Sequence, residues 1–212
     1  MMGSRESSYS TFFDTREDII YQECFQKNET SVCRYILHKR KLVSFFYGDM
    51  EAAAEFFEMG SEYPSGANGR LSHISLGVVI DGLIAFYFAR KHREDECRWT
   101  NIGEAVMDLT RHWAKNSEWN FINKLYLLEA EVFFLRNDES KALEKYEQSI
   151  KAAHDHHFIH EEGLAFERAA SFHLQCGRKG EALACYTQAK KCYQSWGANG
   201  IVCCLERTIQ NL

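Results

Sequence analysis

Four histidines and three carboxylates lie between residues 154 and 162, and they form the densest group of potential metal ligands in the chain. They are His154, Asp155, His156, His157, His160, Glu161 and Glu162. On a helix, His156 lies one turn from His160 and His157 one turn from Glu161, so either pair could hold zinc or nickel. A catalytic metal also needs a third fixed ligand and supporting contacts, which the sequence does not supply. Metal binding by His156, His157, His160 and Glu161 is therefore the alternative hypothesis.

Nucleophilic and acid–base catalysis have less support. The adjacent Cys203 and Cys204 have no histidine or acid at a recognisable spacing, and no Gly-x-Ser-x-Gly turn occurs. Glu129 and Glu131 would point to different faces of a helix, unlike a general acid–base pair. The sequence therefore predicts a protein that is not an enzyme and that needs no cofactor.

Composition narrows the class of partner and the location. The eight cysteines include no Cys-x-x-Cys pair and no secretory leader is evident, which predicts a reducing, cytoplasmic environment. The formal net charge of −5 gives no general attraction to nucleic acid. The most apolar stretch, Ile74 to Ala89, is interrupted by Ser75 and Asp81 and falls short of the roughly 18 apolar residues of a membrane span. It is expected to be a buried helix instead.

A sequence motif that occurs twice indicates the elements that must position these side chains. Residues 136–146 are echoed forty residues later by 176–186, each copy a polar turn, an acidic residue and Ala-Leu-x-x-Tyr. A period of this size is typical of stacked helix pairs, which need neighbours to complete their cores. Residues 50–59, with Ala53 and Phe57 one turn apart, form a weaker third copy.

The apolar periodicity predicts helices along almost the whole chain. A loose N-terminal tail is expected over 1–17 and a helical-repeat domain over 18–212, with a loop at 60–69. The expected helices begin near residue 18 and then cover 31–47, 50–59, 74–89, 100–115, 121–135, 139–153, 161–175, 181–195 and 201–212. The fold class predicted is an all-α solenoid of three to four antiparallel helix pairs with a C-terminal capping helix.

Residues 121–153 and 161–195 resemble tetratricopeptide repeats. The matching positions are small residues where paired helices approach and the aromatic residues near them: Ala130, Phe133, Ala142, Tyr146, Ser149, Ala170, Ala182, Tyr186 and Ala189. The second copy departs from the pattern, because His173 stands in place of its first aromatic. Neither copy ends in proline, and the spacing of forty exceeds the usual thirty-four or so.

Several phrases resemble one region of very large signalling proteins. Residues 119–121, 124–131, 158–165 and 193–198 are similar to the helical region after the ATPase module of kinase–ATPase–sensor proteins. In those proteins that region precedes GAF, histidine-kinase or nucleotide-cyclase domains. The match covers about residues 75–200, and none of the family's catalytic motifs occurs here. The resemblance implies a scaffold segment.

In tetratricopeptide arrays the first helices of the pairs line a concave surface. By that resemblance, the residues expected on it are Lys124, Leu127, Glu131, Phe134, Leu135, Leu164, Glu167, Ser171, Leu174 and Gln175. Leu127, Glu131 and Glu167 disfavour a clamp for a peptide carboxylate, whereas a mixed apolar and acidic groove suits an amphipathic helix or a neighbouring domain. The competing interpretation is that this face is solvated or covered within the molecule.

The resulting functional prediction is non-catalytic protein–protein interaction or interdomain scaffolding in a cytoplasmic signalling protein. The expected partner is a protein or peptide, with kinase, cyclase and ATPase modules as the candidates.

Overall fold

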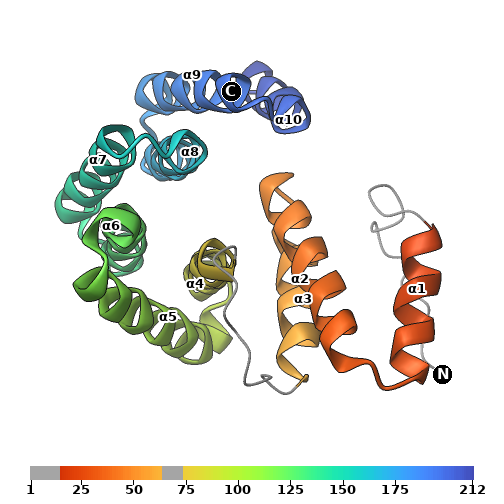
Figure 1. Ribbon diagram of the computed structural model, residues 1–212. Coiled ribbons are helices and arrows are strands. Elements are labelled where there is room, and N and C mark those ends of the chain that lie inside the picture. The colour runs from red at the N-terminus through yellow and green to blue at the C-terminus, as the bar shows by residue number, and fades with distance from the viewer. Residues whose placement is uncertain (1–14, 64–73) are drawn as a thin grey trace. The chain divides into compact units, whose positions relative to one another are not determined.

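The computed structural model describes residues 15–63 and 74–212. All regular elements in these two stretches are helices and none is a strand, which confirms the all-α prediction (Figure 1). Residues 1–14 of the predicted tail and 64–69 of the predicted loop lie outside the described residues, whereas residues 60 and 61, predicted in that loop, are helical. The chain divides into two compact units, 1–77 and 78–212, and each is considered by itself.

The first unit contains α1 (Thr15–Gln26), α2 (Thr30–Phe46) and α3 (Met50–Ser61). Its core is formed by residues of all three helices, with Cys33, Leu37 and Ala52 almost fully buried. The predicted break at Gly48-Asp49 is present: Gly48 has a φ of +80°, and the Asp49 carboxylate accepts a hydrogen bond from the Ala52 N–H at 3.0 Å, which caps α3. Helix α1 begins three residues earlier than predicted.

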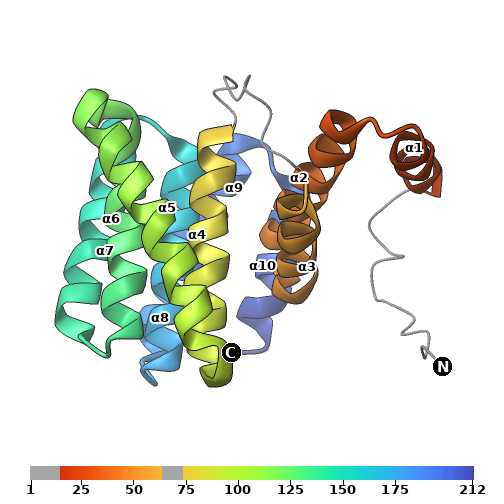
Figure 2. The ribbon, with the colours of Figure 1, turned by 90° about the horizontal axis from the view of Figure 1, so that it is seen from below.

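The remaining helices are α4 (Ile74–Lys91), α5 (Glu96–Asn116), α6 (Glu118–Leu135), α7 (Glu139–Asp155), α8 (Ile159–Gln175), α9 (Lys179–Trp196) and α10 (Asn199–Gln210). A short 3₁₀ turn at Arg93–Asp95 connects α4 to α5. From α5 onward, each helix packs against the next. In the second unit these helices form a curved row, with α4, α6 and α8 on its inner side and α5, α7 and α9 on its outer side (Figure 1). Figure 2 shows their axes standing side by side.

Small residues allow these helices to approach closely. Ala130, Ala142, Ala170 and Ala182 are fully buried, as the repeated motif predicts. Gly103 of α5 faces the ring of Phe86 so closely that a Cβ there would lie 2.5 Å from Phe86 Cε1. Gly82 of α4 likewise leaves room for Leu128, whose Cδ2 would lie 2.7 Å from a Cβ at position 82. Both glycines therefore let a neighbouring side chain pack directly against the helix backbone.

Several predicted helix starts are wrong by a few residues: α8, α9 and α10 each begin two residues earlier than predicted, and the errors are larger at α5 and α6. Helix α5 begins at Glu96 rather than near Thr100, and α6 begins at Glu118 rather than Phe121. The turn expected over residues 116–120 shrinks to Ser117. The acidic residues Glu96 and Glu118 lie in the first turns of their helices, where a carboxylate interacts favourably with the positive end of the helix dipole.

Several large side chains of α6, α7 and α9 form part of the core of the second unit. Leu128, Tyr146, Tyr186 and Tyr193 are buried between helices, whereas Phe133 and Phe166 are only partly buried. The cysteines are all free thiols; the structure buries Cys24 and Cys33 and leaves the others partly or fully exposed. Trp119 and Trp196, both near helix ends, are 57% and 46% exposed. No helix in the described part of the chain is long and apolar enough to cross a membrane.

Candidate binding surface of the inner helices

The ten residues predicted to line a concave surface all lie on α6 and α8, neighbouring helices on the inner side of the curved row (Figure 1). The structure divides them by exposure. Five are buried: Lys124, Leu127, Glu131, Leu135 and Leu164. Four are partly exposed, Phe134, Glu167, Ser171 and Leu174, and Gln175 is exposed. The accessible part of this set therefore lies mainly on α8 and at the C-terminal end of α6.

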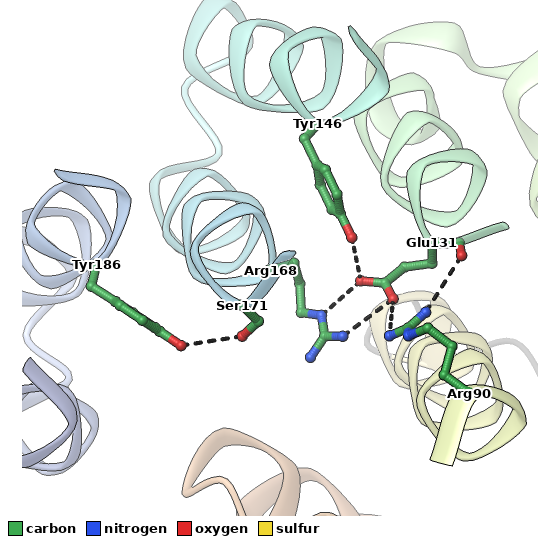
Figure 3. Close-up of polar contacts among 6 residues, drawn as sticks. All are labelled: Arg90, Glu131, Tyr146, Arg168, Ser171 and Tyr186. Carbon is green, nitrogen blue, oxygen red and sulfur yellow. Dashed lines mark hydrogen bonds and ion pairs between the residues drawn. The ribbon is translucent and has the colours of Figure 1, made fainter. Parts of the chain in front are cut away.

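Glu131, at the centre of this set, is completely buried and receives hydrogen bonds from three other helices (Figure 3). Arg168 of α8 donates from Nε to Oε1 at 2.8 Å and from Nη2 to Oε2 at 3.2 Å. Arg90 of α4 donates from Nη2 to Oε2 at 2.7 Å. The Tyr146 hydroxyl of α7 donates to Oε1 at 3.0 Å. One carboxylate thus ties α4, α7 and α8 to α6, and every described donor around it is well placed.

Arg90 also approaches the predicted surface directly. Its guanidinium lies over the ring of Phe134 with the Cζ atom 4.4 Å from the ring centroid, a favourable cation–π geometry. Its Nη1 points at the backbone carbonyl of Glu131 at 3.4 Å. The arginine side chain is thereby held between α4 and the C-terminal half of α6.

The pKa values of the ionisable groups at this centre are strongly shifted. Burial alone would raise the pKa of Glu131, but the guanidinium groups of Arg168 and Arg90 outweigh it and hold that pKa at about 2. Burial opposes the charge of Arg168 as well, and the Glu131 carboxylate nevertheless raises its pKa. Burial, followed by the negative charge of Glu131, raises the pKa of Tyr146 well above its usual value. The centre therefore contains two cations, one anion and a neutral phenol.

The low pKa of Glu131 makes stability depend on acid pH. The ordinary pKa of a glutamate is 4.5, so the native state holds this carboxylate ionised over a range in which the unfolded chain would protonate it. This contribution is fully present above pH 4.5 and is lost as the pH falls toward 2. A shift of this size corresponds to about 3 kcal/mol. Urea unfolding of the wild type should lose about that much between these pH values beyond what Glu131→Gln loses. Identical pH slopes for the two proteins would contradict the assignment.

This centre corrects the expectation of an acidic groove at Glu131. The carboxylate is enclosed by Arg90 and Arg168, and its charge is not presented to a partner. Neither arginine was predicted as a site residue, because Arg90 lies 41 residues and Arg168 lies 37 residues from Glu131 in the sequence. The only available signal was that each lies on an inner helix of the repeat, as Glu131 does.

A second buried ion pair connects the N-terminal halves of α6 and α8. Lys124 donates to Glu161 Oε2 at 2.5 Å, and the Asn123 side-chain amide donates to the same oxygen at 2.6 Å. Burial lowers the pKa of Lys124, and Glu161 partly offsets this. Because Lys124 pairs with Glu161 near the start of both helices and Glu131 pairs with Arg168 further along, α6 and α8 run in the same direction.

The next layer repeats the hydroxyl contact without the charges. Forty residues after Glu131 and Tyr146 come Ser171 and Tyr186, whose hydroxyl oxygens lie 3.2 Å apart (Figure 3). Ser171 is partly exposed, whereas Glu131 is not. The same repeat position therefore holds a buried carboxylate, Glu131, in one layer and a partly exposed hydroxyl, Ser171, in the next.

The alternative metal ligands do not converge. His156 stacks on Trp119 with ring centroids 4.0 Å apart, and His160 stacks on Trp196 at 5.1 Å. His157 is exposed with a φ of +60°, and Glu161 is bound to Lys124. Within residues 15–63 and 74–212, no three His, Cys, Asp or Glu side chains gather closely enough to hold a metal ion. His156 and His160 are instead stacking partners of tryptophans.

No family model, curated protein or solved structure gives a significant match to this chain.

Proposed function

We propose that this chain is a tetratricopeptide-like scaffold that binds a protein or peptide along its inner helices and carries out no catalysis itself. The observation that carries the proposal is the recurrence of one contact in two successive layers. Tyr146 of an outer helix reaches Glu131 of the inner helix before it, and Tyr186 reaches Ser171 in the same way forty residues later. A repeated unit with an equivalent internal contact is the structural basis of a helical-repeat array.

The surface best suited to a partner in this proposal is the accessible part of α8. Glu167, Ser171 and Leu174 are partly exposed there, and Gln175 is exposed. The buried ion pairs of Glu131 and Glu161 link α8 to α6 and so hold this face rigid. A rigid face costs little conformational entropy on binding. We place the scaffold in a cytoplasmic signalling protein, with kinase, cyclase or ATPase modules as the partners.

Site-specific photo-crosslinking tests this function in the cells that produce the protein. A benzophenone amino acid replaces Ser171 on the inner helix, and in a matched variant it replaces Lys191, which is exposed on the outer helix α9. The Ser171 position should capture a discrete polypeptide that mass spectrometry identifies as a signalling module, and the Lys191 position should not. Equal capture at both positions, or no polypeptide captured at Ser171, would rule the proposal out.

A further inference from the structure

A groove on the outer side of the second unit lies between α7 and α9, with α8 as its floor. We call it the outer groove, and it has a volume of about 480 Å³. Its lining is largely apolar, and the residues that matter most are Leu143, Ile150, Phe166, Ala169, His173 and Cys185. None of these residues belongs to the predicted inner surface, so the proposed function does not account for the groove.

The preceding layer provides an internal comparison, because α5, α6 and α7 form an equivalent valley. Positions on α6 and α7 correspond to those on α8 and α9 at a distance of forty residues, as the repeated motif shows. Positions on α5 correspond to those on α7 at a sequence separation of 39 residues. The buried small residues show this, because Gly103, Thr110 and Ala114 of α5 match Ala142, Ser149 and Ala153 of α7. Each residue of one valley therefore has a counterpart in the other.

Ion pairs occupy the preceding valley. Glu129 of α6 lies between two cations, with Lys145 Nζ at 2.9 Å and Arg111 Nη2 at 3.9 Å. Lys145 also lies over the ring of Tyr126, at 4.7 Å from its centroid. Side chains of this kind can lay their methylene stems along apolar surface while the charged groups stay in water.

In the outer groove all three charged residues are replaced by uncharged ones. Ile150 stands at the position of Arg111, Ala169 at that of Glu129 and Cys185 at that of Lys145. All three replacements line the groove. Phe166 is partly exposed in the outer groove, as its counterpart Tyr126 is in the preceding valley. The outer groove therefore differs from the preceding valley in lacking the three charged side chains found there.

His173 adds a polar group to this apolar groove. Its side chain is 7% exposed, and its Nδ1 accepts a hydrogen bond from Arg178 Nε at 3.1 Å. The ring proton must then be on Nε2, and no acceptor for it occurs among the described residues. Burial and the nearby charge of Arg178 lower the pKa of His173, which keeps the imidazole neutral. The counterpart in the preceding layer is Phe133, so the hydrogen-bond donor is particular to this groove.

Two acidic residues flank the outer groove: Glu147 lines it, and Glu181 lies one helical turn before Cys185 on α9. Glu147 of α7 and Glu181 of α9 are exposed, and neither forms an ion pair with any described residue. Both lie close enough to His173 to act on its charge. Among the described residues, the one lysine that lines the groove, Lys151, pairs with Asp155 at 2.5 Å, and the His154 ring contacts Glu162 at 3.1 Å. A partner with basic residues flanking an apolar face is therefore the complementary one.

From these observations we infer that the outer groove binds an amphipathic helix of a protein partner, with its apolar face on Phe166 and Ala169 and its basic flanks on Glu147 and Glu181. The stretch of α7 from Leu143 to His154 is about 16 Å long, which corresponds to three turns of a bound helix. His173 Nε2–H donates to an oxygen of that helix. This inference rests on the proposed function only in that the occupant is a protein segment.

The test is a selection of displayed helical peptides against the full chain. The library has leucines at positions i, i+4 and i+7 and random residues on both flanks. The critical variant, Ala169→Glu with Cys185→Lys, rebuilds the Glu129–Lys145 ion pair of the preceding valley. Leu183→Ala, at an exposed position of α9 that does not line the groove, is the matched control. Thermal unfolding followed by circular dichroism confirms that each variant is folded.

The selected peptides should carry lysine or arginine on their flanks, and their affinity should fall at least tenfold on the Ala169→Glu/Cys185→Lys variant. The control should bind them unchanged, and His173→Phe should weaken binding about fivefold, the effect of one lost hydrogen bond. Peptides that bind the double variant as well as the wild type, or a selection that yields none, would overturn the inference. Photo-crosslinking from position 171 is also measured in the Ala169→Glu/Cys185→Lys variant. Binding at the inner surface is thereby tested independently of binding in the outer groove.

Discussion

Replacing Glu131 with glutamine is expected to lower the free energy of unfolding by about 3–5 kcal/mol, the usual cost of removing one partner from a buried ion pair. The side chain is completely buried and accepts hydrogen bonds from Arg168, Arg90 and Tyr146. Glutamine has nearly the same shape but no charge, so both guanidinium groups would stay in the interior without an anion. Urea unfolding at neutral pH measures the change.

Two further variants separate the charge from the packing at this centre. Tyr146→Phe removes one neutral donor and should cost only about 1 kcal/mol. The triple variant Arg90→Met, Glu131→Leu and Arg168→Met removes all three charges together and should recover most of the stability lost in Glu131→Gln. If the single glutamine variant were as stable as Tyr146→Phe, the buried charge would not have the role assigned to it.

Such a centre is weak grounds for high stability, because desolvation of the ions offsets much of their attraction. Its clearer effect is on the register in which the helices pack against one another. The Glu131 carboxylate fits only where Arg90 of α4, Tyr146 of α7 and Arg168 of α8 all converge. A shift of one helix along another would leave a charge unpaired in the interior, which disfavours alternative registers.

Replacing Tyr186 with alanine is expected to destabilise the protein by a similar amount, about 3–5 kcal/mol. Tyr186 lies on α9, is 6% exposed and packs where α9 meets α8, with its hydroxyl against Ser171. The truncation removes a large ring and leaves a cavity between two helices that cannot close it. Chemical denaturation should report the loss as a lower midpoint with little change in slope.

Tyr186→Phe is the matched control for that truncation. It keeps the ring and removes only the hydroxyl, whose partner Ser171 is itself partly exposed and can turn to water. The expected cost is therefore no more than about 1 kcal/mol. A loss below about 1 kcal/mol for the alanine variant would mean that the ring does not hold α8 and α9 together.

The helices of this protein could be predicted from the sequence because their signals are local. Apolar residues three or four positions apart place the buried face of each helix, and turn residues such as Gly48-Asp49 mark where a helix ends. The errors were of two to four residues at the starts of α1, α5, α6, α8, α9 and α10. The recurrence of Ala142 and Tyr146 as Ala182 and Tyr186 predicted which side chains are buried between helices.

The polar contacts could not be predicted in the same way. Glu131 was placed on a surface because its position in the repeat allowed it, and nothing near it in sequence indicated Arg90 or Arg168. The histidines from 154 to 160 looked like ligands because they are close in sequence, yet a turn separates them and each of His156 and His160 stacks on a tryptophan. In the sequence, Ala169 and Cys185 are ordinary small residues. Only the comparison with the preceding valley shows that they stand at the positions of Glu129 and Lys145.

By itself the sequence determined that the chain is helical, where its helices lie and that two of its layers are alike, because these properties follow from the spacing of residues within a turn or two of helix. Only the tertiary structure decided that Glu131 is enclosed by two arginines and that an apolar groove opens beside Ala169. Both depend on which faces of separate helices pack together. Ion pairing and apolar exposure are set by contacts between helices that are distant in sequence, and no local spacing of residues specifies those contacts.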